Sequence, residues 1–201
     1  MNLTNVDEIA IGLGTQGNTT IPGGSGKVFI DDVRLERAPE GGTVNLLTNG
    51  GFEDGVPDPW RIYDSTGGGA TMELVGDDSV EGSSSLHIVV PTAGANFWDV
   101  GLSQDGFVFE AGKNYTLSAF LKCKEGTLDV NFKPEHAADP WEGFGDQVIT
   151  ISDQWVEYSV TTPVIPDDVD PATITFHIGF APGEIWLDNV RFYKGDYTPP
   201  E

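Results

Sequence analysis

The sequence of 201 residues predicts an all-β protein, an antiparallel β-sandwich of the jelly-roll type. Short segments in which apolar and polar residues alternate recur along the chain, and turns rich in Gly, Pro and Asp separate them. The chain contains 26 Gly and 13 Pro, as expected for many tight turns. No long segment shows an apolar stripe of helical period. About nine short strands after residue 44 suffice for two packed sheets.

The first expected elements are two strands at residues 8–13 and 27–34. Residues 26–35 resemble residues 183–192, and four of the ten positions (Gly, Asp, Val, Arg) are identical. The same closing strand therefore occurs twice, and such repeats often mark modular proteins.

This repeat predicts three parts in the chain. Residues 1–40 are expected to be the closing hairpin of an upstream β-sandwich domain plus a linker, residues 41–195 a complete jelly-roll domain, and residues 196–201 a further linker. Two strands alone are marginally stable in water. The hairpin is therefore expected to pack on the main domain or to pair with another chain, which would give a dimer through residues 8–35.

The clearest alternation lies in the second half of the chain. Strands are expected near residues 115–123, 127–133, 155–160, 173–178 and 185–193. In the first of these, one face carries Tyr115, Leu117, Ala119 and Leu121.

Alternation also assigns side chains to the outer faces. Ile174, Phe176 and Ile178 take one face of their segment, so Thr173, Thr175 and His177 take the other. By the same count Asn131 and Lys133 oppose the face of Leu128, Val130 and Phe132, and Phe120 opposes Leu121.

The charge of the chain excludes some partners. With 32 acidic and 10 basic residues, the formal net charge is −22, so nucleic acids and anionic membranes are unfavourable partners. No apolar run approaches the length that spans a membrane, and no membrane insertion is expected. Neutral ligands and cations such as calcium fit this charge. Cys123 is the single cysteine, which excludes an intrachain disulfide, and we expect it to be buried.

Four motifs occur in a characteristic order: Asn-Leu-Leu-Thr-Asn-Gly-Gly-Phe-Glu from Asn45, Val-Glu-Gly-Ser-Ser-Ser-Leu-His-Ile from Val80, Gly-Lys-Asn-Tyr-Thr-Leu-Ser-Ala-Phe from Gly112, and Ile-Trp-Leu-Asp-Asn-Val-Arg-Phe from Ile185. Together they resemble the carbohydrate-binding modules of families 4, 9 and 22. The resemblance covers residues 44 to about 194. It implies a jelly roll with a structural calcium ion (Ca²⁺), a sugar-binding cleft on one concave sheet face, and a secreted or cell-surface protein.

The predicted calcium site joins the two ends of the domain. Glu53 and Asp188 come from the opening and closing motifs, and a hard cation would neutralise both. By position in the resembling modules, the ligands would be the carbonyl of Gly51, the Glu53 side chain, carbonyls near Glu81 and Ser84, and Asp188. The alternative is that both acids are surface or turn-capping residues. No second calcium is expected at Asp31, because the opening motif of that upstream domain is missing.

The resemblance also implies a set of sugar-binding residues. Trp98 matches a cleft tryptophan, Trp141 lies in a loop that carries a second cleft aromatic, and His177 matches a ligand-contacting histidine. The alternatives are a core position for either tryptophan and a hydrogen-bonded structural role for His177. Aromatic side chains that face outward can stack on the apolar face of a sugar ring, while amides and imidazoles bind hydroxyls. The complete candidate set is Trp98, Gln104, Phe120, Asn131, Trp141 and His177. Trp60, Trp155 and Trp186 are expected in the core.

The identity of the sugar cannot be carried over from the resemblance. Xylan-binding relatives place arginines in the cleft, and the matching positions here are Asp146 and Thr173.

The sequence therefore predicts a non-catalytic module that binds a plant, algal or microbial polysaccharide and targets a larger secreted protein to it. One alternative is a structural spacer or adhesion module without a sugar ligand. Another is a small glycan-cleaving enzyme, since Glu135 and Glu142 flank Trp141 and could mimic a glycosidase pair. Loop acids near a binding cleft explain these two residues more simply. The three histidines lack metal-ligand spacing.

Overall fold

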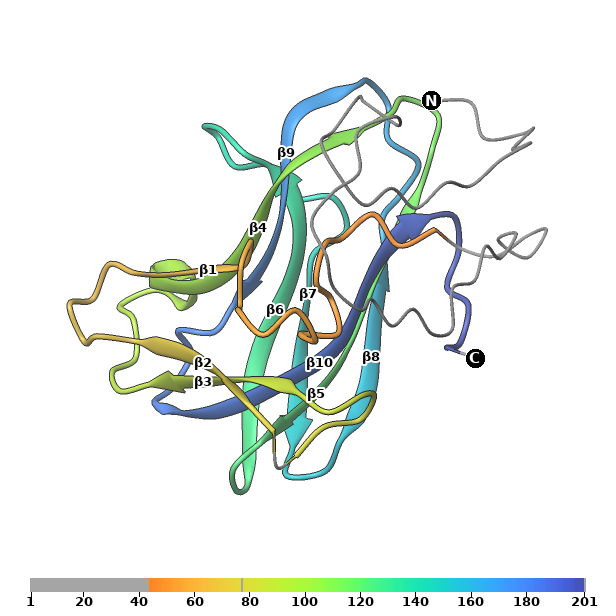
Figure 1. Ribbon diagram of the computed structural model, residues 1–201. Helices are drawn as coiled ribbons and strands as arrows, with labels where there is room; N and C mark the ends of the chain where they lie inside the picture. The colour runs from red at the N-terminus through yellow and green to blue at the C-terminus, as the bar shows by residue number, and fades with distance from the viewer. Residues whose placement is uncertain (1–43, 77, 201) are drawn as a thin grey trace, which may run out of the picture. The chain divides into compact units, whose positions relative to one another are not determined.

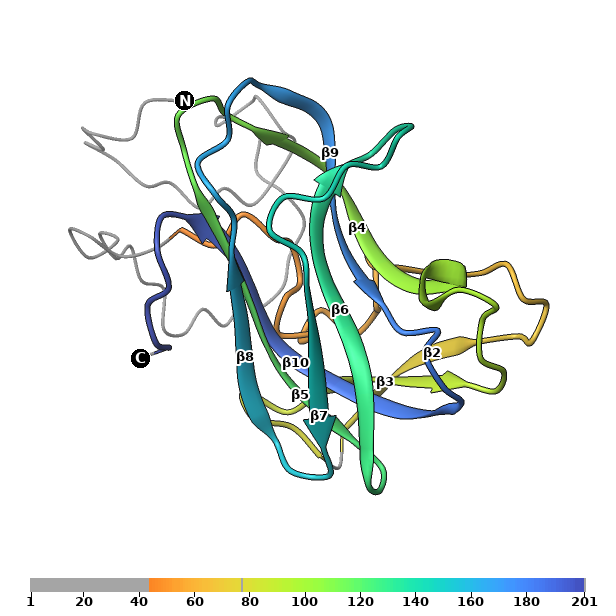
Figure 2. The same cartoon turned by 180° about the vertical axis from the view of Figure 1, so that it is seen from behind.

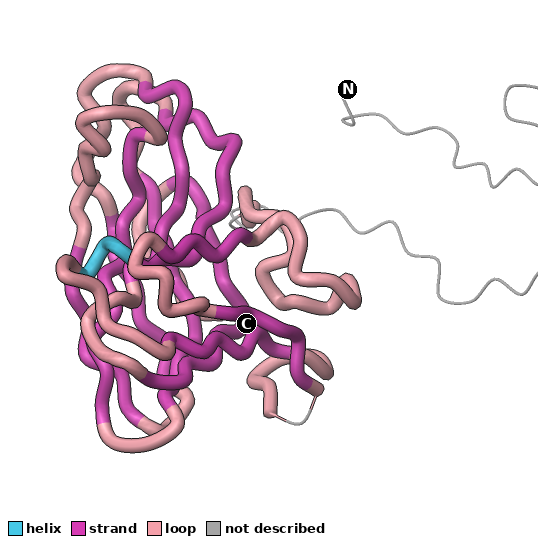
Figure 3. Tube along the Cα trace, turned by 90° about the vertical axis from the view of Figure 1, so that its left-hand side faces the viewer, coloured by secondary structure: helices cyan, strands magenta, loops and turns pink. Residues whose placement is uncertain are grey.

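The computed structural model describes residues 44–76 and 78–200 as a sandwich of two antiparallel sheets. Figures 1 and 2 show the two sheets from opposite sides, and Figure 3 shows a chain of strands and loops with one short helical turn. The predicted all-β jelly roll is confirmed. The hairpin at 8–35, Asp31 and the boundary of the 1–40 segment lie outside the described residues, so what the sequence indicates about them, including the dimer, stays a prediction.

Each sheet has five strands. The first sheet has the order β1-β4-β9-β6-β7, formed by Arg61–Asp64, Val100–Phe109, Val169–His177, Thr127–His136 and Gln147–Ser152. The second has the order β2-β3-β10-β5-β8, formed by Thr71–Val75, Ser85–Val90, Gly183–Lys194, Tyr115–Cys123 and Val156–Thr161. Within the described ranges the single helical turn, η1, is Phe97–Asp99.

The structure has one strand more than the approximate number that the sequence predicted. Among the strands that alternation did not single out, β1, β2 and β7 are short edge strands of four to six residues. No helix in the described ranges is long and apolar enough to cross a membrane.

The core lies between the inner faces of the two sheets. The predicted face of Tyr115, Leu117, Ala119 and Leu121 is at most 1% exposed, and Cys123 on the same face is equally buried, as expected. Burial raises the pKa of the Cys123 thiol, which disfavours the reactive thiolate. From the first sheet, the same core receives Val130, Phe132, Ile174, Phe176 and Ile178.

The opening motif closes the domain by clasping β10. The Asn45 side chain donates to the Val190 carbonyl (3.0 Å) and accepts from the Phe192 amide (2.9 Å). The Val190 amide in turn donates to the carbonyl of Gly50 (2.8 Å). Residue 50 must be glycine because a Cβ there would overlap the Val190 carbonyl. The first and last segments of the domain are thereby held together.

Only one of the three tryptophans expected in the core lies there. Trp60 is 1% exposed, and its Nε1 donates to the Asn49 carbonyl (3.1 Å). The prediction was wrong for Trp186 and Trp155, which are half-buried and contact polar groups. Trp186 stacks on His87 with ring centroids 4.3 Å apart, and Trp155 Nε1 donates to Asp78 (2.7 Å).

Lys122 explains how these two indoles are accommodated outside the core. Its ammonium lies 4.9 Å from the Trp186 ring and 5.4 Å from the Trp155 ring, and it pairs with Asp78. An indole can be covered by such a cation and still reach a polar partner with its N–H.

We expect Gly50→Ala to lower the free energy of unfolding by about 1–3 kcal/mol, because the added methyl group has no room against β10. Urea denaturation measures this change. Gly51→Ala is the matched control, since nothing lies within 4 Å of a Cβ at position 51. Its effect should stay within about 0.5 kcal/mol. Equal effects of the two variants would contradict a close contact between residue 50 and β10.

Candidate functional site

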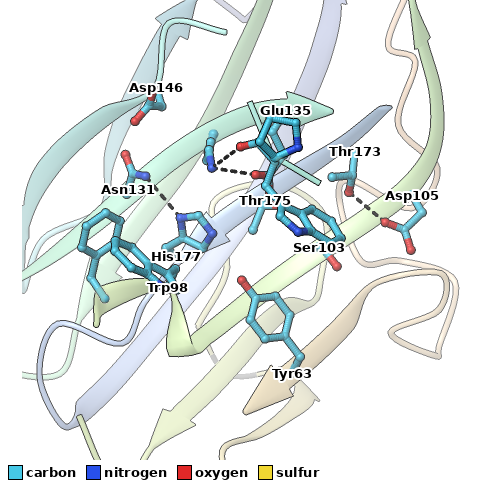
Figure 4. Close-up of a pocket in the computed structure, with 14 residues that line it drawn as sticks. Tyr63, Trp98, Ser103, Asp105, Asn131, Glu135, Asp146, Thr173, Thr175 and His177 are labelled. Atoms are coloured by element: carbon cyan, nitrogen blue, oxygen red, sulfur yellow. Dashed lines mark hydrogen bonds and ion pairs between the residues drawn. The ribbon is translucent and has the colours of Figure 1, made fainter. Parts of the chain in front are cut away.

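A cleft of about 720 Å³ lies on the outer face of the first sheet. Its floor comes from β4, β9 and β6, and its walls come from β1, from η1 and from the loop between β6 and β7. Figure 4 shows the side chains that line it. The cleft is therefore built on strands whose opposite faces fill the core.

The floor consists of three rows of side chains across β4, β9 and β6. The strand register fixes these rows because partners face each other across neighbouring strands. Within each strand, core residues alternate with the floor residues. The rows are Gly101–His177–Asn131, Ser103–Thr175–Lys133 and Asp105–Thr173–Glu135.

Gly101 makes room for one wall of the cleft. A Cβ at this position would overlap the ring of Tyr63, which extends from β1. Tyr63 is 38% exposed and lines the cleft. Burial, followed by the charge of Glu135, raises the pKa of the Tyr63 hydroxyl. The hydroxyl therefore stays protonated at neutral pH and can donate a hydrogen bond.

Two tryptophans from loops complete the walls. Trp98 and Trp141 are 51% and 53% exposed, which is unusual for side chains of this size. Phe97 supports Trp98 edge-on at 4.8 Å and is itself stacked on Phe180 at 4.7 Å. The carbonyl of Trp141 accepts a hydrogen bond from Lys133 Nζ (2.8 Å), which ties its loop to the floor.

His177 and Asn131 form a buried pair in the first row. Asn131 Nδ2 and His177 Nδ1 lie 3.2 Å apart. Burial, followed by the charge of Lys133, lowers the pKa of His177 to about 4. The ring is therefore neutral at pH 7. With Nδ1 accepting from the amide, Nε2 carries the proton and can donate to a hydroxyl.

The cleft brings together four of the six predicted sugar-binding residues: Trp98, Asn131, Trp141 and His177. The structure shows that these four residues line the same cleft. Their role in binding stays a prediction. The predicted outward direction of Thr175 and Lys133 is confirmed by their place in the lining.

Gln104 and Phe120 lie elsewhere, so their assignment to the cleft was wrong. Gln104 is 3% exposed, and its amide faces inward, where it bonds both the N–H and the carbonyl of Thr48 at 2.9 Å. It lies on the inner face because it alternates in phase with Val100 and Leu102. Phe120 points away from the core as expected, but β5 belongs to the second sheet.

Sequence reasoning missed five lining residues: Tyr63, Phe97, Ser103, Asp105 and Pro140. Alternation with Val100 and Leu102 could have placed Ser103 and Asp105 on the outer face. Nothing in the sequence indicates that Tyr63 leans over Gly101, because this contact joins two strands.

The predicted calcium ligands Glu53 and Asp188 meet at one loop, residues 80–84. Glu53 Oε1 accepts from the amides of Ser83 and Ser84 (2.8 and 2.7 Å). Asp188 Oδ2 accepts from those of Val80 and Glu81 (2.7 and 3.0 Å).

The environment of the two carboxylates fits a cation. Asp188 is fully buried, and burial raises its pKa. Among the described residues no basic side chain pairs with Asp188 or Glu53, and the backbone amides of residues 80–84 meet their charges instead. A cation could add to this compensation, because each carboxylate oxygen accepts more than one partner. No three His, Cys, Asp or Glu side chains of the described ranges converge on one point. Two carboxylates and several carbonyls, the predicted set, need no such cluster, and calcium stays a prediction.

The two acids that could mimic a glycosidase pair do not share the cleft. Glu135 lies in the third row of the floor, whereas Glu142 lines a second, smaller groove beside His136.

Comparisons with known proteins agree with this architecture. The sequence profile of the family described as "Carbohydrate binding domain" matches residues 44–185. A cellulose 1,4-beta-cellobiosidase of Acetivibrio thermocellus is 24% identical over an alignment 172 residues long, which covers 78% of this chain and 18% of that relative. The chain thus spans less than a fifth of this curated relative.

Two solved structures show the same fold. A CBM4 structure is 24% identical with a TM-score of 0.59, and the match covers 74% of this chain and 99% of that one. A xylan-binding CBM22 domain from Paenibacillus barcinonensis is 14% identical with a TM-score of 0.56, and the match covers 74% of this chain and 93% of that one.

The lowered pKa of His177 predicts that acid destabilises the folded protein. Unfolded histidine has a pKa of about 6.5, so between this value and about 4 the unfolded chain binds a proton that the folded chain excludes. The contribution of neutral His177 to the free energy of unfolding is fully present above about pH 6.5 and decreases as the pH is lowered toward 4. Between pH 7 and 4 the wild type should lose about 3 kcal/mol more than His177→Gln.

Denaturation at several pH values measures this difference, and NMR titration of the imidazole measures the pKa directly. Parallel stability curves of wild type and variant would contradict the prediction.

Proposed function

The chain belongs to the carbohydrate-binding domain family, and we propose that its cleft holds a polysaccharide chain by stacking sugar rings on Trp98 and Trp141. The observation that carries this proposal is the distribution of exposed aromatic side chains. Among the described residues, four large aromatics are exposed, and Tyr63, Trp98 and Trp141 line the cleft. Exposed apolar surface that gathers in one concave site favours a ligand with apolar faces.

The floor supplies the polar half of such a site. Ser103, Thr175 and the neutral ring of His177 can donate to hydroxyls or accept from them. Sugar rings present apolar C–H faces and a rim of hydroxyls, so aromatic walls above a polar floor match both parts.

A structural spacer would use the same sandwich without a ligand. In that case Trp98 and Trp141 should be covered, yet both are more than half exposed and share one cleft. This observation favours binding over a spacer role.

The cleft offers little support for glycan cleavage. Glu135 forms an ion pair with Lys133 (2.8 Å), and Glu142 is not part of the lining. Glycosidases usually use two carboxylates that flank one bond, and the other two lining carboxylates, Asp105 and Asp146, lie at opposite ends of the cleft (Figure 4). We therefore propose a non-catalytic role.

We further propose that this domain acts outside the cell as one part of a larger protein. The curated relative is a cellobiosidase more than five times longer than the matched region. A tethered binding domain raises the local concentration of the polysaccharide around its neighbour.

Trp98→Ala and Trp141→Ala should each weaken binding at least about tenfold, because each removes a stacking surface. Affinity gel electrophoresis and a glycan microarray against β-glucans, xylans, galactans and marine polysaccharides give the measurement. Trp155→Ala is the matched control, since this indole is half-buried and lies outside the cleft. Undiminished binding by both cleft variants would contradict the assigned site, and no binding by the wild type would contradict the function.

We propose a structural role for calcium in addition. Glu53 and Asp188 would hold it together with carbonyls of Gly51 and of the loop that contains Glu81 and Ser84. When bound, the ion would neutralise two carboxylates and connect the opening motif to β10.

Removal of calcium with a chelator should lower the melting temperature without abolishing the fold, since a ligand that binds only the native state stabilises it by mass action. Calorimetry with and without added calcium measures the shift. Glu53→Gln should remove most of it, whereas Glu73→Gln, which replaces an exposed acid on β2, should leave it intact. An unchanged melting temperature in the wild type would contradict the site.

A further inference from the structure

The charges inside the cleft are unevenly compensated. Lys133 is the single lysine or arginine among the described lining residues, against the carboxylates of Asp105, Glu135 and Asp146. His177 adds no charge near pH 7, because burial keeps it neutral.

Lys133 has little left to offer a ligand anion, because two of its three N–H groups are already engaged. Its ammonium lies 2.8 Å from Glu135 Oε2 and donates to the carbonyl of Trp141 at 2.8 Å. Its side chain is only 18% exposed. Lys133 and Glu135 therefore neutralise each other and serve to hold the Trp141 loop.

The negative charges of Asp105 and Asp146 are not offset by a strong ion pair within the described residues. Asp105 accepts from the Thr173 hydroxyl (2.8 Å), which is a neutral donor. Arg61 lies 3.7 Å away, but its side chain is 76% exposed, and such surface pairs contribute little. Asp146 forms no ion pair with any residue in the described ranges. The two carboxylates lie at opposite ends of the cleft (Figure 4).

We propose that Asp105 and Asp146 form a charge filter that excludes glycan chains bearing carboxylates or sulfates. This inference rests on the proposed function and names the chemistry of its ligand. A chain that lies in the cleft passes both residues. A neutral ring can donate its hydroxyls to them, because carboxylates accept hydrogen bonds. An anionic substituent would meet like charge at both ends, and no lining residue between them offers an unpaired ammonium or guanidinium.

The large net charge of the chain must be separated from this local effect. A charge of −22 repels polyanions from every face. Repulsion over distances beyond about 8 Å is screened at 0.15 M salt, whereas contacts within a cleft are screened much less. The filter therefore predicts a discrimination that survives salt and depends on two positions.

The test compares one glycan in two forms. The protein is titrated separately with a neutral and with a carboxymethylated derivative of the polysaccharide that the wild type binds; for cellulose these are hydroxyethylcellulose and carboxymethylcellulose. Calorimetry at 0.15 M and 0.5 M salt should show at least about tenfold tighter binding of the neutral form at both concentrations.

Two matched double variants identify the source of this preference. D105N/D146N should bring the two affinities to within about threefold of each other. E73Q/D153N removes the same number of exposed charges outside the cleft and should keep the wild-type ratio. D146N alone breaks no hydrogen bond within the described residues, so it serves as the test if the double variant folds poorly. It should partly reduce the ratio of the affinity for the neutral glycan to that for the carboxymethylated glycan.

Each result decides the proposal. An unchanged ratio in D105N/D146N and in D146N, or an equal change in the control, would overturn the filter and leave sugar binding intact. Equal affinity of the wild type for the neutral and the carboxymethylated glycan would also overturn the filter and leave sugar binding intact. Absence of binding to every glycan of the panel would overturn the proposed function, and the filter with it.

Discussion

The register of β9 between β4 and β6 is the constraint on which the rest of the molecule depends. Ile174 and Phe176 of β9 fill the core, while Thr173, Thr175 and His177 form the middle of the cleft floor. A shift of one residue would exchange the two faces, and every apolar side chain of the strand would reach solvent. The hydrophobic effect that stabilises the sandwich thus also fixes the order of polar groups on its outer face.

The two ends of the domain depend on a second constraint, the contact of the opening motif with β10. Asn45 and Gly50 hydrogen-bond to the same strand that carries Asp188. Asp188 and Glu53 then fix the loop at residues 80–84 through its backbone amides. Three segments far apart in sequence meet here, which explains why the same short motifs mark both the fold and the predicted metal site.

The cleft combines rigid and loop-borne parts. Its floor rests on paired strands, so its polar groups are held by the backbone ladder. Its aromatic walls come from η1 and from the β6–β7 loop, and each is anchored by one contact, Phe97 on Phe180 and Lys133 on the Trp141 carbonyl. Lys133 consequently supports the architecture of the wall instead of offering its charge to a ligand. This leaves the cleft acidic, in line with the charge of the whole chain.

The sequence alone determined the sandwich and the facing of its long strands, because period-2 alternation is a local property that burial enforces. It also identified four residues that line the cleft, through ordered motifs and alternation. It failed for Phe120, because alternation states that a side chain faces in or out but not which sheet carries it. It also failed for Gln104, which alternates in phase with the core residues Val100 and Leu102, and for Trp155 and Trp186, which polar partners hold outside the core. Only the tertiary structure decided that Gln104 hydrogen-bonds to Thr48 inside the sandwich, that Tyr63 leans over Gly101, and that Lys133 forms an ion pair with Glu135. Each of these is a contact between segments distant in the chain, and such contacts leave no periodic trace in the sequence.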